Sequence, residues 1–153
     1  MTRFSRGVRL GVDVGQVRVG VAISDPDGIL ATPLVTLARD LTSAGTAVPA
    51  DISALARLVE LHQAVAVVVG LPVTLAGRHG PAVTHVQAYV RRLAPAIGPV
   101  PVNLVDERLS TVVASRRLAE RGVRGRRQRA VVDQAAAVEI LQSWLDGQRR
   151  PTG

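Results

Sequence analysis

Three runs of strand-forming residues follow one another near the start of the chain, and the turns between them are too short for parallel pairing. The runs are Arg9–Val14, Arg18–Ser24 and Leu30–Leu37. Runs rich in Val and Ile and bounded by Gly, Pro and Asp are typical of strands, and a parallel connection needs about a dozen residues or more. The chain is therefore predicted to open with an antiparallel meander, in which Pro33 favours an edge position for the third strand.

Helical and strand patterns then alternate along the rest of the chain. Strands that are each reached through a helix are expected to run parallel to the first strand. The expected elements are a helix over Ala50–His62, a strand over Val65–Gly70, a helix from Pro81, a strand over Val100–Val105, a helix from Ser110 or Thr111 to Arg121, and a last helix over Ala130–Gly147. This order predicts an α/β fold, a mixed five-stranded sheet with helices on both faces.

Length and composition predict one intracellular domain. The chain has 153 residues, which suggests a single domain over residues 1–153 with a core of about residues 9–146. It contains no Cys, which excludes disulfides and thiolate metal sites. The N-terminus has no apolar stretch of signal-peptide length before the first strand, and the longest dense apolar run, which starts at Ala64, is far shorter than a membrane span. We therefore expect a cytoplasmic protein that does not engage a membrane.

The charge of the chain points to an anionic partner. The formal net charge is +7, and every basic residue is Arg. Without Lys, a Walker-type phosphate loop and Schiff-base chemistry are excluded. A positive excess is typical of proteins that bind nucleic acid, although many small proteins are basic for other reasons.

Three acidic residues are predicted to meet at one edge of the sheet. Asp13 lies near the end of the first strand, Glu107 follows the last strand, and Asp133 opens the last helix on its apolar side. The carboxyl ends of parallel strands share one edge, where α/β proteins place their sites. Carboxylates gathered there repel one another, and Mg²⁺ or Mn²⁺ would remove the conflict. Two such ions can cleave a phosphodiester bond.

Each acid also has an ordinary structural explanation when it is taken alone. Asp133 could favour the helix macrodipole, Asp13 could be a turn residue, and Glu107 could pair with Arg108 or Arg117 on the surface. The metal-site hypothesis depends on all three acids together. The His residues show no paired metal-ligand spacing; they are His62, His79 and His85.

A basic segment precedes Asp133. Its arginines are Arg121, Arg124, Arg126, Arg127 and Arg129. They are predicted to lie in a Gly-containing loop that binds phosphate, mobile over Gly122–Gln128 without ligand; the alternative is a solvated charged surface. The three aromatic residues, Phe4, Tyr89 and Trp144, are too scattered to stack single strands, and Trp144 is expected in the core.

Four motifs in order resemble the YqgF (RuvX-like) family of small bacterial RNase H-like proteins. They are "GVDVGQVRVGVAISD", "VVVGLPVTLAGRHGP", "VDERLSTVVA" and "VVDQAAAVEIL", and the resemblance covers about Arg9 to Asp146. It implies an RNase H-like fold with sheet order 3-2-1-4-5. It also implies that Asp13, Glu107 and Asp133 form a catalytic, metal-binding triad, and that Arg18 is a phosphate contact. The basic position that the family places just before its last acid is nearest here to Arg129.

The resemblance also implies a function. It favours a metal-dependent nuclease that processes the 5′ end of pre-16S ribosomal RNA in ribosome biogenesis, with two Mg²⁺ or Mn²⁺ ions and possible contact with pre-ribosomal particles. Two alternatives stay open: a Holliday junction resolvase that acts on branched DNA, and a non-catalytic RNA-binding assembly factor. "DVGQVRVG" also resembles the first phosphate loop of actin-like ATPases, but the chain is too short for their two lobes.

Overall fold

The computed structural model describes residues 5–42, 47–72, 80–106 and 126–149, and in the last of these ranges it describes side chains for residues 132–148. These segments build a five-stranded sheet of order β3-β2-β1-β4-β5. The strands are β1 (Arg9–Val14), β2 (Arg18–Ser24), β3 (Ala31–Ala38), β4 (Ala66–Leu71) and β5 (Val102–Asp106). β1–β2 and β2–β3 pair antiparallel, whereas β1–β4 and β4–β5 pair parallel. The predicted meander, strand directions and sheet order are confirmed.

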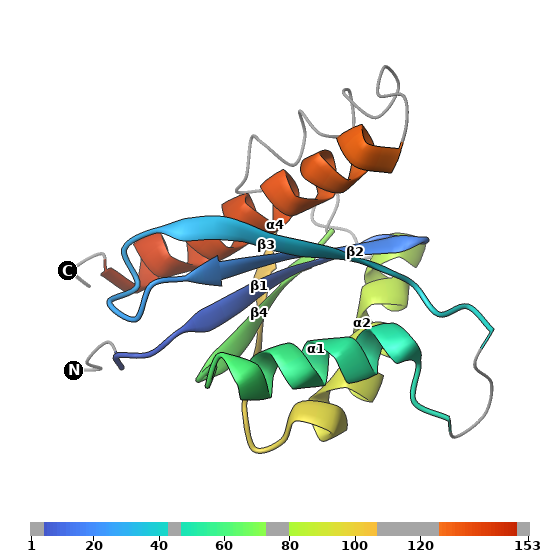
Figure 1. Cartoon of the computed structure of the whole chain (residues 1–153), viewed down its shortest axis with the longest axis horizontal. Helices are drawn as coiled ribbons and strands as arrows, with labels where there is room; N and C mark the ends of the chain where they lie inside the picture. Colours follow the sequence, from blue (N-terminus) through green and yellow to red (C-terminus); the bar gives the residue numbers. More distant parts are fainter. Residues whose placement is uncertain (1–4, 43–46, 73–79, 107–125, 150–153) are drawn as a thin grey trace.

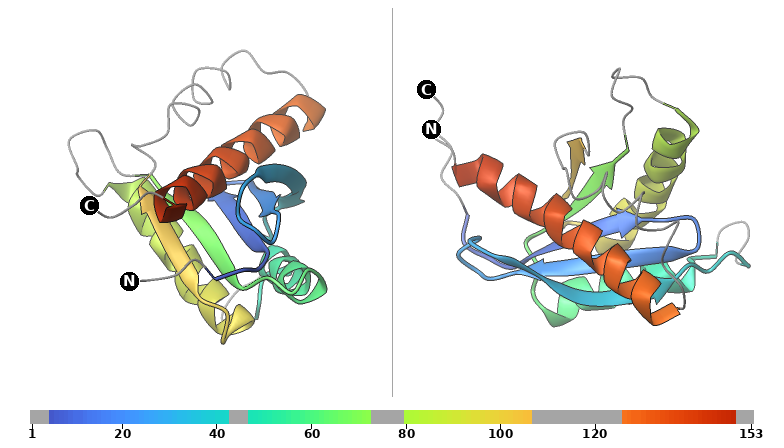
Figure 2. Two further views of the ribbon diagram at one scale, coloured as in Figure 1. Left: turned by 90° about the vertical axis from the view of Figure 1, so that its left-hand side faces the viewer. Right: turned by 90° about the horizontal axis from the view of Figure 1, so that it is seen from above.

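Helices cover both faces of the sheet, as predicted. α4 (Arg126–Arg149) crosses one face, and α1 (Ala50–Leu61) and α2 (Pro81–Ile97) lie on the other (Figures 1 and 2). Pro81 occupies the first turn of α2, where its missing N–H costs nothing. The helix expected between Ser110 and Arg121 falls outside the described residues.

Strand alternation divides the core into two layers. Leu10 and Val12 of β1 join the cluster that packs under α1 and α2, whereas Ala22 and Val68 join the cluster that contains Ile140 of α4. Successive side chains of a strand point to opposite faces. The residues that alternate with Leu10 and Val12, namely Gly11 and Asp13, therefore point towards α4.

Two strand glycines let α4 approach the sheet closely. A Cβ atom on Gly11 would lie 2.6 Å from the Cβ of Leu141, and one on Gly20 would lie 2.5 Å from the carbonyl carbon of Asp133. Cβ atoms in real proteins essentially never come that close to other atoms. Glycine inside a strand often marks a close approach of this kind, so Gly20 fixes where Asp133 rests on the sheet.

The start of the last helix differs from the prediction. α4 begins at Arg126 rather than near Ala130, so the loop prediction is wrong for Arg126, Arg127 and Arg129, and the predicted mobile loop cannot extend over residues 126–128. Arg is a good helix former. Residues 126–132 contain neither Gly nor Pro, so nothing in this stretch breaks the helix. Positions 122–125 lie outside the described residues. The other elements that the structure describes agree with prediction to within two residues.

The position of β3 matches a further expectation. β3, which contains Pro33, is an edge strand, and its pairing with β2 is irregular at Val21 and Ala22, next to the proline. Among the described segments, no helix is both long and apolar enough to cross a membrane.

Candidate active site

Asp13 is a buried carboxylate that faces α4. It pairs directly with Gly20 across the β1–β2 ladder, and only 3% of its surface is exposed. Side chains of directly paired residues lie on the same face of a sheet. Asp13 therefore shares a face with the position at which Gly20 meets the helix.

Asp133 comes to the same place from α4. It is 7% exposed, and its Cβ lies 3.1 Å from where a Cβ of Gly20 would be. Because Cβ atoms of a direct antiparallel pair are about 4.5–5.5 Å apart, the Cβ atoms of Asp13 and Asp133 lie within roughly 9 Å of each other. Two of the three predicted acids are thus brought together by the close packing of α4 on β2.

Arg18 binds Asp133 in an ion pair. The Nε atom of Arg18, at the start of β2, donates a 2.7 Å hydrogen bond to Oδ2 of Asp133, and the two side chains are 29% and 11% exposed. A charge-assisted bond of this length is among the stronger ones in proteins. The guanidinium therefore compensates one of the two carboxylates that Asp13 and Asp133 bring to this face.

The macrodipole explanation of Asp133 is wrong. α4 has no acidic residue in its first turn, and Asp133 lies well inside the helix, where the dipole effect has fallen off. Its burial is explained by Gly20 beneath it and by Arg18 beside it. The phosphate contact expected of Arg18 remains a prediction, because in the structure its Nε is engaged with Asp133.

The third acid, Glu107, lies outside the described residues. β5 ends one residue earlier at Asp106, which pairs with Leu71 at the end of β4. Since β1, β4 and β5 are parallel, their carboxyl ends share one edge, and this is the edge that carries Asp13. Within the ranges that the structure describes, no group of three or more potential metal ligands is found.

The residues present fit a hard divalent cation. Asp13 and Asp133 supply carboxylate oxygens, which Mg²⁺ and Mn²⁺ prefer, and both are buried enough to be poorly hydrated. The ion pair uses Oδ2 of Asp133, and a carboxylate has a second oxygen that can bind a metal ion.

The predicted phosphate-binding arginines are described only in part. The backbones of Arg126, Arg127 and Arg129 form the first turn of α4, and Arg121 and Arg124 lie outside the described residues. Seven residues separate Arg126 from Asp133, which corresponds to about two turns and roughly 10 Å along the helix axis. The basic end of α4 thus lies close to the acidic pair along the same helix.

Sequence reasoning missed the part played by Gly11 and Gly20. Both interrupt runs of larger apolar residues in predicted strands, and a glycine in that position is a recognised sign of close backbone approach. That signal could have located the crossing of α4 over β1 and β2. It could not have named Asp133 as the residue that rests on Gly20.

Comparison with known proteins shows the family of the chain. Residues 7–147 match the RuvX family, which is described as "Holliday junction resolvase". A protein of Frankia casuarinae named "Putative pre-16S rRNA nuclease" is 58% identical over 142 residues, which cover 93% of this chain and 68% of that protein. A protein of the same name from Rhodococcus opacus is 53% identical, and the match covers 95% of this chain and 80% of that protein. Another from Mycobacterium sp. (strain KMS) is 56% identical, and the match covers 94% of this chain and 82% of that protein.

Among solved structures, Thermus thermophilus RuvC in complex with a Holliday junction substrate superposes with a TM-score of 0.54 at 17% identity, covering 93% of this chain and 95% of that chain. A second Thermus thermophilus RuvC structure gives a TM-score of 0.52 at 16% identity, with 92% and 95% covered. At this level of identity the likeness concerns the fold, and it confirms the RuvC-like RNase H fold. With the family match over residues 7–147 and relatives above 50% identity, the chain belongs to the RuvX family.

Proposed function

We propose that this protein is a metal-dependent nuclease that hydrolyses phosphodiester bonds and processes the 5′ end of pre-16S ribosomal RNA. The observation that carries the proposal is the meeting of Asp13 and Asp133, both more than nine-tenths buried, on one face of the sheet. The names of the relatives, at 53–58% identity, support ribosomal RNA as the substrate. Such a role favours a place in the cytoplasm, in contact with pre-ribosomal particles.

The three acids share one task in this proposal. Asp13, Asp133 and Glu107 would hold Mg²⁺ or Mn²⁺, and two bound ions would activate the attacking water and stabilise the leaving oxygen. The burial of Asp13 keeps its carboxylate in one orientation and excludes competing water. Arg18 fixes Asp133 through Oδ2, and its cationic side chain is well placed to attract the phosphate backbone.

Binding in this proposal rests on arginine–phosphate contacts. Arg18, Arg124, Arg126, Arg127 and Arg129 are the candidates, and they fit the net charge of +7. Stacking platforms for bases need exposed aromatic rings, whereas Tyr89 is 4% exposed and Trp144 is partly buried against the core under α4. We therefore expect weak base preference.

Two alternative functions have a specific basis. The description of the family as Holliday junction resolvase favours branched DNA as the substrate. The basic character of the chain would also suit an RNA-binding assembly factor without catalysis. Both alternatives are separated from the proposal by one cleavage experiment.

We expect purified protein to cleave a labelled pre-16S fragment in the presence of Mg²⁺ or Mn²⁺, and not in EDTA. The reason is that the carboxylates of Asp13 and Asp133 would need a bound metal ion before they could take part in phosphodiester hydrolysis. The measurement is product formation on a denaturing gel with three substrates at equal concentration: the pre-16S fragment, a four-way DNA junction and a plain duplex. Cleavage at the mature 5′ end identifies the proposed activity.

Each other outcome of this assay has a meaning. Cleavage of the junction alone assigns the protein to the resolvase class. Binding of the RNA without cleavage of any substrate, in both metals, would support the assembly-factor alternative. Equal cleavage of all three substrates would contradict a specific role in ribosomal RNA processing.

Replacing Arg126 and Arg129 by Ala is expected to weaken nucleic-acid binding evenly across sequences. Helical spacing puts positions 126 and 129 on the same side of α4 as Asp133, whereas position 127 is turned away by about 120°. The slope of log affinity against log salt should fall by up to about 0.9 for each phosphate of a duplex-like substrate that is no longer neutralised. Fluorescence anisotropy over a range of salt concentrations measures this slope.

Arg127→Ala is the comparison variant for this pair of changes, since Arg127 is also a candidate contact and its replacement removes the same charge from another side of the same turn. The slope should change less in Arg127→Ala than it changes, for each replaced residue, in the double variant. The slope could also stay unchanged in all variants, including one that also carries Arg124→Ala. That result would support the alternative interpretation, in which the basic segment is a solvated surface.

A further inference from the structure

The turn between β1 and β2 connects the two strands that carry Asp13 and Arg18. It is a tight turn, in which the backbone N–H of Gly15 donates a 2.9 Å hydrogen bond to the carbonyl of Arg18. Gln16 is exposed, and Val17 is 52% exposed. The tip of the turn therefore has little packing of its own, and contacts from elsewhere must fix its position.

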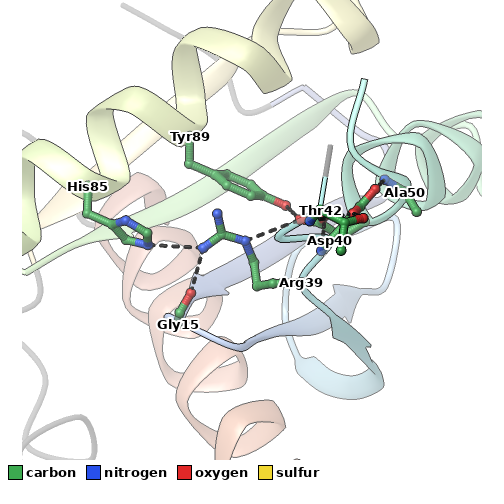
Figure 3. A network of polar contacts seen from close by, with 8 residues as sticks. Gly15, Arg39, Asp40, Thr42, Ala50, His85 and Tyr89 are labelled. Carbon is green, nitrogen blue, oxygen red and sulfur yellow. Dashed lines mark hydrogen bonds and ion pairs between the residues drawn. The ribbon is translucent and has the colours of Figure 1, made fainter. Parts of the chain in front are cut away.

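Arg39 binds this turn on both of its arms. Its backbone N–H donates a 2.9 Å bond to the carbonyl of Val17, and its Nη1 donates a 2.8 Å bond to the carbonyl of Gly15. The second of these bonds can be followed in Figure 3. Arg39 follows directly after β3, so one residue links the end of that edge strand to the turn beside the site.

The side chain of Arg39 is itself held by the two helices on the far face of the sheet. Its Nη1 lies 3.0 Å from Nε2 of His85 on α2, and its guanidinium carbon lies 4.8 Å above the ring of Tyr89. Its Nε is 3.5 Å from Oδ2 of Asp51 on α1. Because Arg39 has no proton acceptor, Nε2 of His85 must accept the bond.

Asp51 is the buried anion that completes this network. It is 2% exposed, and it accepts hydrogen bonds from the hydroxyl of Tyr89 at 2.7 Å and from the backbone N–H of Asp40 at 2.9 Å. Burial, with the bond to Asp51, raises the pKa of Tyr89 far above its ordinary value, so the phenol stays protonated and donates. A carboxylate so deeply buried needs a cation nearby, and Arg39 is that cation.

We propose that Arg39 is a positioning residue for the active site. It is anchored between α1 and α2, it holds the β1–β2 turn, and it thereby keeps Asp13 and Arg18 in their places relative to Asp133. The inference rests on the proposed function for its effect on cleavage. The side chain of Arg39 contacts α1 and α2, opposite α4, whereas Asp13 pairs with Gly20 on the face that carries α4. Arg39 thus acts through the backbone of the turn and does not contact the reacting groups.

The test compares Arg39→Gln and Arg39→Lys with the unchanged protein by amide hydrogen exchange. The N–H of Gly15 and the N–H of residue 39 report whether the turn is held, because both are bonded within it. Loss of the guanidinium should speed exchange at Gly15 by about tenfold or more, as expected for a lost charge-assisted bond. Arg39→Lys keeps the buried charge and a donor group but loses the planar fork of the guanidinium, so it should restore part of the protection.

The second readout is metal binding and cleavage. Mn²⁺ affinity, measured by calorimetry, should fall by roughly tenfold in Arg39→Gln, the usual effect of a residue that orients metal ligands. If the protein cleaves RNA, kcat should fall by at least as much, while KM should change less, because Arg18 alone among the candidate phosphate-binding arginines depends on the turn. Arg39→Lys should lie between the two.

Tyr89→Phe is the matched control. It removes a buried hydrogen bond to Asp51 but keeps the ring under Arg39, so it should lower the thermal midpoint without speeding exchange at Gly15 or weakening Mn²⁺ binding. Unchanged exchange at Gly15 in folded Arg39→Gln, or equal effects of Tyr89→Phe and Arg39→Gln on the turn, would overturn the proposal. If the unchanged protein cleaves nothing, the proposed function fails, and hydrogen exchange still decides the role of Arg39.

Discussion

Replacing Asp13 by Asn is expected to lower the rate of RNA cleavage by a factor of about 10³, which corresponds to roughly 4 kcal/mol of lost transition-state stabilisation. Asn has nearly the same shape, so the packing around this 3% exposed side chain is preserved. The change removes one negative charge and one strong metal ligand at the face shared with Asp133. Initial rates at saturating Mg²⁺, with circular dichroism to confirm the fold, measure the effect.

Asp27→Asn is the control for this prediction. Asp27 lies in the turn between β2 and β3, where it forms an exposed ion pair with Arg6, so its loss should leave the cleavage rate unchanged. Exposed pairs of this kind contribute little to stability. Cleavage by Asp13→Asn at the rate of the unchanged protein would remove Asp13 from the catalytic site.

Replacing Gly20 by Ala is expected to destabilise the protein by about 1–3 kcal/mol or more. The new methyl group would overlap the backbone of Asp133, 2.5 Å from its carbonyl carbon, and a backbone cannot move aside as a flexible side chain can. α4 would have to shift away from β2, which would also disturb the Arg18–Asp133 bond. Urea unfolding followed by circular dichroism gives the free energy, and Mn²⁺ titration reports the damage to the site.

Gly147→Ala provides the matched control on α4. A Cβ at this position would meet nothing within 4 Å, and Ala is favoured over Gly in a helix by about 1 kcal/mol. This variant should be as stable as the unchanged protein or slightly more stable. Equal stability of Gly20→Ala would mean that the helix does not rest on β2 as described.

The sheet could be predicted because each of its strands carries a local signal. Short turns dictated the antiparallel meander, the connections through helices dictated the parallel strands, and Pro33 marked an edge. The order of the strands came from the resemblance to a family. In these respects local sequence and final structure agree.

The start of α4 could not be read from the sequence because two signals conflicted there. A run of arginines next to glycines indicates a loop. Arginine is nevertheless a good helix former, and residues 126–132 contain neither Gly nor Pro. The error mattered for Asp133, since a later start would have put that acid in the first turn. Its place inside the helix removes the macrodipole as an explanation.

The network around Arg39 could not be predicted from the sequence. Arg39 follows β3, Asp51 lies in α1, and His85 and Tyr89 lie in α2, so the four residues meet only when α1 and α2 pack on the sheet. Each residue alone looks like an ordinary loop or helix residue. In contrast, Asp13 could be singled out because an acid inside an apolar strand is costly without a partner.

The bond between Arg18 and Asp133 joins residues 115 positions apart in the chain. At about 5–20 residues per second, a ribosome needs roughly 6–23 s to add that length. During this time the nascent meander already contains Asp13, but the helix that supplies Asp133 has not been made. Asp13 and Asp133 therefore cannot meet until α4 has been added, so the proposed active site is absent from the growing chain until that helix is made.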